Sequence, residues 1–146
     1  MNQRRSKTVL VVDDDADLVL AFRKRLISAG YNVITATSGT QAFREARAGH
    51  IDAITLDVGL WDQISGLDVA SILSREPETG AIPILFITGQ ADDAFASRQR
   101  EAGGRCFLSK PVDMDLLIRV LDGLFGFDEL SEARRISSAK RRQPIT

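Results

Sequence analysis

Three consecutive aspartates, Asp13, Asp14 and Asp15, follow the apolar run "TVLVV" near the start of the chain. Adjacent carboxylates repel one another, so a group of them at the end of a strand requires a positive partner. A fourth carboxylate, Asp57, ends a second apolar run, "IDAITLD". A compact cluster of oxygen ligands with open coordination positions suits Mg²⁺, which keeps several waters and accepts phosphate oxygens. These aspartates therefore predict a magnesium site.

Two further polar side chains follow later apolar runs. Thr88 ends "IPILFIT", and Lys110 lies in "FLSKP". A hydroxyl and an ammonium beside a metal site can stabilise a phosphoryl group during transfer, because such transfer depends mostly on positioning and charge neutralisation. An aspartate can act as the nucleophile and form an acyl phosphate. We therefore expect phosphoryl transfer to an aspartate, with Asp57 as the acceptor across the sheet from the metal-binding acids.

These residues must be brought together by the fold, and the periodicity of the sequence indicates how. Apolar runs alternate with amphipathic stretches, which predicts a strand followed by a helix five times over. The predicted strands are 8–13, 31–36, 51–57, 82–88 and 105–109, and the predicted helices are 16–30, 39–49, 66–76, 91–104 and 113–125. This order is typical of an α/β fold, a doubly wound, flavodoxin-like parallel sheet with strand order 2-1-3-4-5.

In open sheets of this kind, ligands bind beyond the carboxyl ends of the strands, where the strand order reverses. Asp13–Asp15 follow the first predicted strand, Asp57 ends the third, Thr88 ends the fourth and Lys110 follows the fifth. The first and third strands are neighbours in the expected order, and the fourth lies beside the third. We therefore expect these side chains to converge.

Simpler explanations exist for parts of the pattern. An aspartate after a strand can merely cap the next helix, and "DDD" alone would favour that explanation. The polar residues at the other strand ends favour the metal site instead. The segment "DDDAD" also resembles a calcium-binding loop, but that loop requires glycine at position six and glutamate at position twelve. Leu18 and Lys24 occupy those positions, which excludes it.

The composition is that of an ordinary soluble domain, with 146 residues, 44% hydrophobic and 27% charged. No apolar run approaches the roughly 20 residues that span a bilayer, and none follows the N-terminus as in a signal peptide. We therefore expect no membrane contact and a cytoplasmic location.

The single cysteine, Cys106, is expected to be a small buried hydrophobe. His50, the only histidine, is expected in a loop, without partners for a zinc site.

Charge is distributed unevenly along the chain. Residues 1–7 and 131–146 carry eight of the 19 basic residues and one of the 20 acidic residues, which leaves 11 basic against 19 acidic between them. An acidic body argues against nucleic-acid binding by the folded part. We expect a basic arm at 1–6, one folded domain at 7–126 and a basic, disordered tail at 127–146, which could also be the start of a linker in a longer regulator.

Taken together, the segments "VLVVDDDADL", "IDAITLDVGL", "IPILFITGQAD" and "CFLSKPVD" resemble the response regulator receiver domain of two-component signalling, of the chemotaxis-regulator type. The resemblance covers about residues 7–126. It implies that Asp57 accepts a phosphoryl group from a phosphohistidine of a sensor histidine kinase or phosphotransfer protein. Asp13, Asp14 and Asp57, with the backbone carbonyl of Gly59, would hold Mg²⁺.

The resemblance also implies a conformational switch. Thr88 would hydrogen-bond one phosphoryl oxygen, Lys110 would pair with another, and Pro111 would follow through a cis bond. Phe107 takes the place of the switch aromatic and would turn inward, although simple core packing also explains it. The face of the fourth helix, fifth strand and fifth helix would then bind a downstream protein. The protein would catalyse only its own phosphorylation and dephosphorylation, as a monomer or a phosphorylation-dependent dimer.

Some features depart from the family pattern, and one other family remains an alternative. The loop after Asp57 is one residue longer than usual, and Trp61 replaces a common proline, either as a partner anchor or as part of a lid. Gly59 and Gln90 stand where side chains usually tune the phosphoryl lifetime.

The alternative is a phosphatase resembling the haloacid dehalogenase superfamily, which places its nucleophile in the first strand and a paired acid late in the chain. Here the paired acids come first.

Overall fold

Five parallel strands form one sheet, in the order β2-β1-β3-β4-β5, in the computed structural model, which describes residues 3–59, 64–89 and 93–127. The strands are β1 (Thr8–Val12), β2 (Asn32–Ala36), β3 (Ala53–Asp57), β4 (Ile84–Thr88) and β5 (Gly104–Ser109). The helices are α1 (Ala16–Ala29), α2 (Gly39–Arg47), α3 (Gly66–Arg75), α4 (Asp93–Glu101) and α5 (Met114–Leu124), and a short 3-10 helix, η1 (Gln3–Ser6), precedes β1. The predicted α/β fold and its strand order are confirmed.

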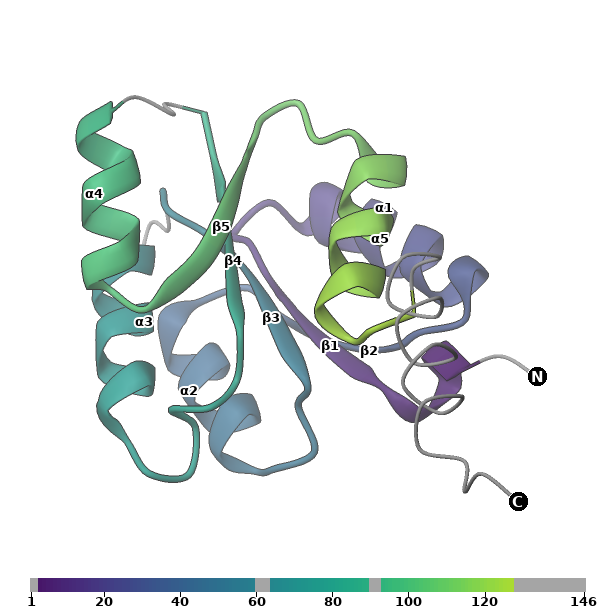
Figure 1. Ribbon diagram of the computed structural model, residues 1–146, viewed down its shortest axis with the longest axis horizontal. Helices are drawn as coiled ribbons and strands as arrows, with labels where there is room; N and C mark the ends of the chain where they lie inside the picture. Colours follow the sequence, from purple (N-terminus) through teal and green to yellow (C-terminus); the bar gives the residue numbers. More distant parts are fainter. Residues whose placement is uncertain (1–2, 60–63, 90–92, 128–146) are drawn as a thin grey trace, which may run out of the picture.

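The central strands are buried on both faces of the sheet. Every residue of β3 and β4 is buried, and so is every residue of β1 after Thr8. Their unbroken aliphatic sequences fit this position, because helices cover both faces of a parallel sheet. One core layer packs under α1 and α5, and the other under α2, α3 and α4, as the two sides of the sheet in Figure 1 show.

The predicted element bounds differ from the observed ones by up to three residues, and the largest difference has a clear cause. The fourth helix was predicted to reach residue 104, but α4 ends at Glu101. Gly103 has a φ of 90°, which ends the helix, and Gly104 already begins β5. Gly30 ends α1 as predicted, with a φ of 108° and its N–H bonded to the helix carbonyls. Among the described residues, no helix is long and apolar enough to cross a membrane.

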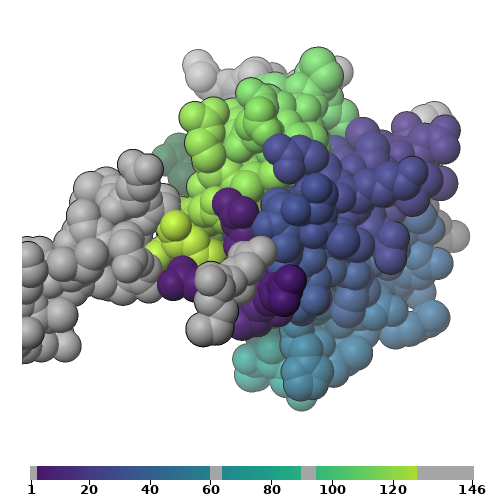
Figure 2. Space-filling model, turned by 90° about the vertical axis from the view of Figure 1, so that its right-hand side faces the viewer, coloured from purple at the N-terminus to yellow at the C-terminus, as the bar shows by residue number. Residues whose placement is uncertain are grey.

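Helix η1 was not predicted, and Arg4 attaches it to the domain. The Arg4 guanidinium donates from Nε and Nη2 to the two carboxylate oxygens of Asp122 in α5, at 2.9 and 2.6 Å, and from Nη1 to the carbonyl of Ala29 at 3.0 Å. The Tyr31 hydroxyl donates to the same carboxylate at 2.6 Å. Figure 2 shows the N-terminal segment, in dark purple, beside the end of α5. Arg4 and the Asp122 carboxylate thus join the segments before β1 and β2 to the ends of α1 and α5.

This network predicts a specific loss of stability at alkaline pH. Burial, together with the hydrogen bond to the Asp122 carboxylate, raises the pKa of Tyr31 above its usual value of about 10. A raised tyrosine pKa contributes stability below about pH 10, and that contribution is lost as the pH rises further. Above about pH 10, the free energy of unfolding should therefore fall faster in the wild type than in Tyr31→Phe. Urea denaturation at a series of pH values measures this, and parallel curves would contradict it.

Candidate functional site

An open pocket of about 440 Å³ lies at the carboxyl ends of the central strands. It is lined by Asp13, Asp14, Asp15, Asp57, Val58, Gly59, Thr88, Gly89 and Lys110. All the residues for which the sequence predicted a metal-binding or phosphoryl-binding role are in this lining. The structure therefore brings together, at one edge of the sheet, groups that are up to 97 positions apart in the sequence.

The strand register explains why these groups meet. Val12 pairs with Leu56, so the next residues, Asp13 and Asp57, lie side by side at the ends of β1 and β3. Asp57 pairs with Ile87 in β4, which places Thr88 one position further along. Thr88 in turn pairs with Ser109, so Lys110 is the first residue beyond β5. Its N–H donates to the Thr88 carbonyl at 2.8 Å, which holds the start of this loop against β4.

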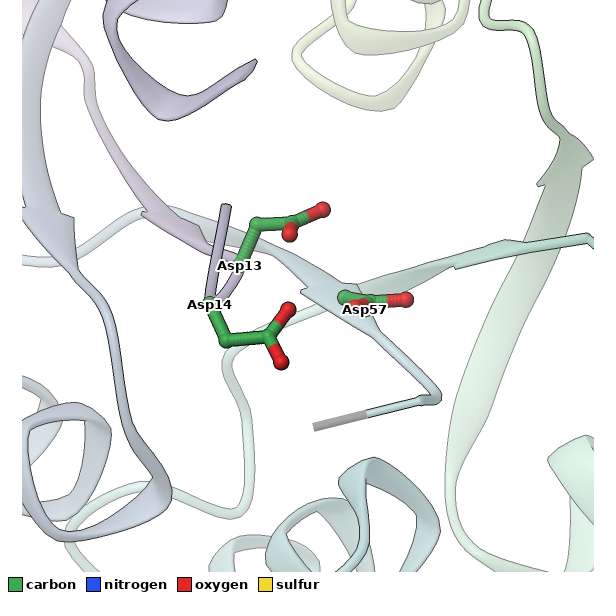
Figure 3. A group of neighbouring side chains, drawn as sticks. All are labelled: Asp13, Asp14 and Asp57. Atoms are coloured by element: carbon green, nitrogen blue, oxygen red, sulfur yellow. The ribbon is translucent and has the colours of Figure 1, made fainter. Parts of the chain in front are cut away.

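Three carboxylates in the pocket are close enough to share a metal ion. One oxygen each from Asp13, Asp14 and Asp57 lies within 4.8 Å of the others. Figure 3 shows Asp13 and Asp14 following β1, beside Asp57 at the end of β3. Opposite ligands of a Mg²⁺ ion are about 4.2 Å apart, twice its usual bond length of about 2.1 Å. The spacing and the all-oxygen donor set therefore fit Mg²⁺, with small side-chain movements.

Lys110 supplies positive charge to this cluster. Its Nζ atom lies 3.3 Å from an oxygen of Asp13 and 3.3 Å from an oxygen of Asp57. Partial burial lowers the pKa of Lys110, but the two carboxylates outweigh it, and the net effect raises the pKa. The side chain is therefore a protonated ammonium bridging two strands. The Lys110–Pro111 peptide bond is cis, as expected.

The three consecutive aspartates have different roles. Asp15 caps α1, because its exposed carboxylate accepts hydrogen bonds from the N–H groups of Asp17 and Leu18. Asp13 is buried, and one of its oxygens accepts the N–H of Asp15 at 2.9 Å. Burial raises the pKa of Asp13, although this hydrogen bond and Lys110 lower it. The helix-cap explanation is thus correct for Asp15, whereas Asp13 and Asp14 take part in the acidic cluster.

Phe107 lies outside the pocket, on the side of β5 that faces α4. Its ring meets the ring of Phe95 edge-on, with centroids 5.1 Å apart, and Phe95 meets Phe86 in the same way at 6.0 Å. Phe107 is half-buried, while the other two rings are fully buried. It therefore packs at the margin of the core, beside Phe86 of β4 and Phe95 of α4.

The remaining predicted residues of interest are less involved. Cys106 was expected to be buried, but it is half-buried because β5 is an edge strand, and burial raises the pKa of its thiol. His50 lies in an exposed loop before β3, as expected, with a positive φ of 70°. Trp61 and Gln90 lie outside the described residues. Val58 and Gly89 also line the pocket, but neither carries a polar side chain that would mark it in the sequence.

Replacing Asp13 with asparagine should stabilise the protein in the absence of Mg²⁺. The raised pKa means that the folded state favours the uncharged carboxyl, so at neutral pH the buried charge lowers the stability. An amide keeps the shape and can still accept the N–H of Asp15. We expect the melting temperature to rise by roughly 2–8 °C, the usual effect of about 1 kcal/mol.

The same variant should lose the stabilisation that Mg²⁺ gives to the wild type, because a ligand that binds only the folded state raises its stability. The control is Asp17→Asn, on the exposed side of α1, which should retain the full Mg²⁺ effect. Thermal melts with Mg²⁺ and with EDTA measure both quantities. A destabilised Asp13→Asn in EDTA, or an undiminished Mg²⁺ effect, would contradict the assignment.

Comparison with known proteins gives matches along most of the chain. Residues 9–122 match the family model of the response regulator receiver domain. The chain is 31% identical over 121 residues to the polar-differentiation response regulator DivK of Brucella ovis, covering 83% of this chain and 98% of DivK. The chemotaxis protein CheY4 of Vibrio cholerae has a TM-score of 0.76 at 25% identity, covering 81% of this chain and 98% of CheY4.

A further solved structure is relevant to the metal. The receiver domain of the sensor histidine kinase PA1611 from Pseudomonas aeruginosa has a TM-score of 0.75 at 26% identity, covers 83% of this chain and 98% of that domain, and holds a magnesium ion in its active site cleft. Receiver domains bind Mg²⁺ at an acidic site of this kind. The family match also decides against a phosphatase of the haloacid dehalogenase type. The chain therefore belongs to the response regulator receiver domains, the signalling modules of two-component systems.

Proposed function

We propose that this receiver domain accepts a phosphoryl group on Asp57 from a phosphohistidine of a sensor histidine kinase or a phosphotransfer protein. The main support is the position of Asp57, 5% exposed at the end of a central strand, with Lys110 3.3 Å away and the carboxylates of Asp13 and Asp14 beside it. Asp13 shares Lys110 and the neighbouring acids, but Asp57 also lies on the strand next to β4, which ends in Thr88.

In the proposed reaction, an oxygen of Asp57 forms a bond to phosphorus as the bond from phosphorus to the imidazole nitrogen breaks. The bonding electrons leave with the imidazole, and Asp57 becomes an acyl phosphate. Asp13, Asp14, Asp57 and the Gly59 carbonyl would hold Mg²⁺. When bound, Mg²⁺ would offset the negative charge of the carboxylates and the phosphoryl oxygens, which otherwise repel one another.

Lys110 and Thr88 would bind the transferred group. The Lys110 ammonium already lies 3.3 Å from Asp57, so a short movement away from Asp13 brings it to a phosphoryl oxygen. Thr88 is buried at the end of the neighbouring strand, one position beyond the partner of Asp57. A hydrogen bond from its hydroxyl to a second phosphoryl oxygen would move the segment that follows β4.

The proposed output is a change at the face formed by α4, β5 and α5. Movement of Thr88 would change the space beside Phe107, whose ring contacts α4 through Phe95. The inward-turned ring would stabilise a second arrangement of α4, to which a downstream protein binds. Figure 1 shows α4 beside β5 at one edge of the sheet.

We place the protein in the cytoplasm, acting through protein contacts, as a monomer or a phosphorylation-dependent dimer.

Phosphoramidate, the simplest phosphorus–nitrogen donor, tests the acceptor. With Mg²⁺, the wild type should gain one phosphoryl group, measured by intact-protein mass spectrometry, and Asp57→Asn should gain none. The matched control is Asp52→Asn, just before the start of the same strand, where the carboxylate accepts the N–H of Thr8 at 2.8 Å. This control should be labelled like the wild type. Labelling of Asp57→Asn at the wild-type rate would refute the proposal.

The proposed switch predicts that Phe107→Ala uncouples phosphorylation from the output face. The rate of labelling should stay within about twofold, because Phe107 does not line the pocket. Hydrogen exchange of α4 should change on phosphorylation in the wild type and in Phe43→Ala, which removes a ring from α2 instead. It should not change in Phe107→Ala. If α4 in Phe107→Ala responds to phosphorylation as it does in the wild type, Phe107 serves core packing alone.

A further inference from the structure

Gly66, the first residue of α3, lies directly against the backbone of the proposed acceptor. A Cβ atom at this position would lie 2.2 Å from the carbonyl oxygen of Asp57 and 2.9 Å from the Cα atom of Val58. Separations below 3.0 Å are essentially never seen for real Cβ atoms. The obstructing atoms belong to the backbone, so no side-chain rotation can remove the contact. Any other residue at position 66 must therefore displace either α3 or the Asp57–Val58 segment.

Helix α3 is anchored in the core, so part of the displacement falls on the acceptor segment. Val69, Ala70 and Leu73 of the helix are fully buried in one core layer. The Ser65 hydroxyl caps the helix by accepting the N–H of Asp68 at 3.2 Å. Close-packed cores transmit displacement and do not absorb it. The segment after β3, in contrast, borders the open pocket.

The same segment sets the geometry of the acceptor. The N–H of Gly66 donates to the carbonyl of Val58 at 3.2 Å, and the N–H of Gly59 donates to a carboxylate oxygen of Asp57 at 3.2 Å. A shift of this turn therefore moves both the carboxylate and the Gly59 carbonyl proposed as a metal ligand. Relief of a 2.2 Å contact requires a movement on the order of 1 Å, and a displacement of about 1 Å can slow a positioned reaction by about a hundredfold.

We propose that Gly66 is a positioning residue for phosphoryl transfer. Because it has no side chain, α3 can pack directly against the Asp57–Val58 peptide and hold the Asp57 carboxylate in place beside Asp13 and Asp14. This inference rests on the proposed role of Asp57. The two glycines that line the pocket, Gly59 and Gly89, are different, since a Cβ there meets only the Asp57 carboxylate at 3.8 Å or nothing within 4 Å. Close packing against backbone distinguishes Gly66 from both.

Gly80 provides a matched control. A Cβ atom at Gly80 would lie 2.9 Å from the Glu76 carbonyl oxygen and 3.0 Å from that of Ser74, so Gly80→Ala also forces a side chain against backbone. This crowding occurs after the far end of α3, and Gly80 does not line the pocket. Ser65→Ala is a second control, because it weakens the start of α3 without adding an atom next to Asp57.

The experiment compares Gly66→Ala, Gly80→Ala, Ser65→Ala and the wild type in three measurements. These are the melting temperature in EDTA, its shift with increasing Mg²⁺, and the labelling rate with phosphoramidate at a temperature where every variant is folded by circular dichroism. Gly66→Ala should lower the labelling rate by roughly 10- to 100-fold. It should also raise the Mg²⁺ concentration that gives half of the maximal thermal shift. The two controls should lose only thermal stability.

Three outcomes would overturn the proposal. Labelling and Mg²⁺ response of Gly66→Ala could equal those of the wild type. They could fall equally in Gly80→Ala, which would make them a consequence of lost stability. Gly66→Ala could also fail to fold while both controls fold, in which case the contact serves folding and not positioning. If the wild type itself gains no phosphoryl group on Asp57, the proposed function fails, which is a separate and distinguishable result.

Discussion

The structure concentrates negative charge in a buried cluster at the carboxyl ends of the central strands, and this charge has to be balanced. Asp13 and Asp57 are only 4% and 5% exposed, and like charges so close together are unfavourable unless cations balance them. Lys110 supplies one positive charge at 3.3 Å from each. A single ammonium cannot neutralise the three carboxylates of the cluster, so the pocket retains negative charge that suits a divalent cation.

A second charged network lies near the amino ends of β1 and β2 and serves only to stabilise the fold. There the carboxylate of Asp122 receives two hydrogen bonds from the Arg4 guanidinium and one from the Tyr31 hydroxyl. Its charge is matched by one cation, and the hydrogen bonds satisfy both oxygens. The pocket at the carboxyl ends has the reverse balance, with more negative than positive groups. Such an excess is typical of sites that bind a ligand, because stability alone would select against it.

The sequence was sufficient to predict the strands and most of the pocket, because both follow local rules. Apolar runs of strand length mark the sheet, and the polar residues directly after them must lie at its carboxyl edge. It could not predict contacts between distant segments. The pairing of Arg4 with Asp122 joins residues 118 positions apart, and the approach of Gly66 to the Asp57 carbonyl depends on how α3 packs. Nor could it separate Asp15, which caps α1, from its two neighbours, since all three are aspartates.

Anomalous diffraction from crystals grown with Mn²⁺ can locate a divalent ion in the pocket, because Mn²⁺ prefers the same carboxylate, carbonyl and water ligands as Mg²⁺. We expect one strong peak in the pocket, at about 2.0–2.6 Å from carboxylate oxygens contributed by both strand ends, Asp57 on one side and Asp13 or Asp14 on the other. We also expect Lys110 to withdraw from Asp13 to make room. Crystals with no peak between these strand ends, or with the ion held elsewhere, would contradict the magnesium site.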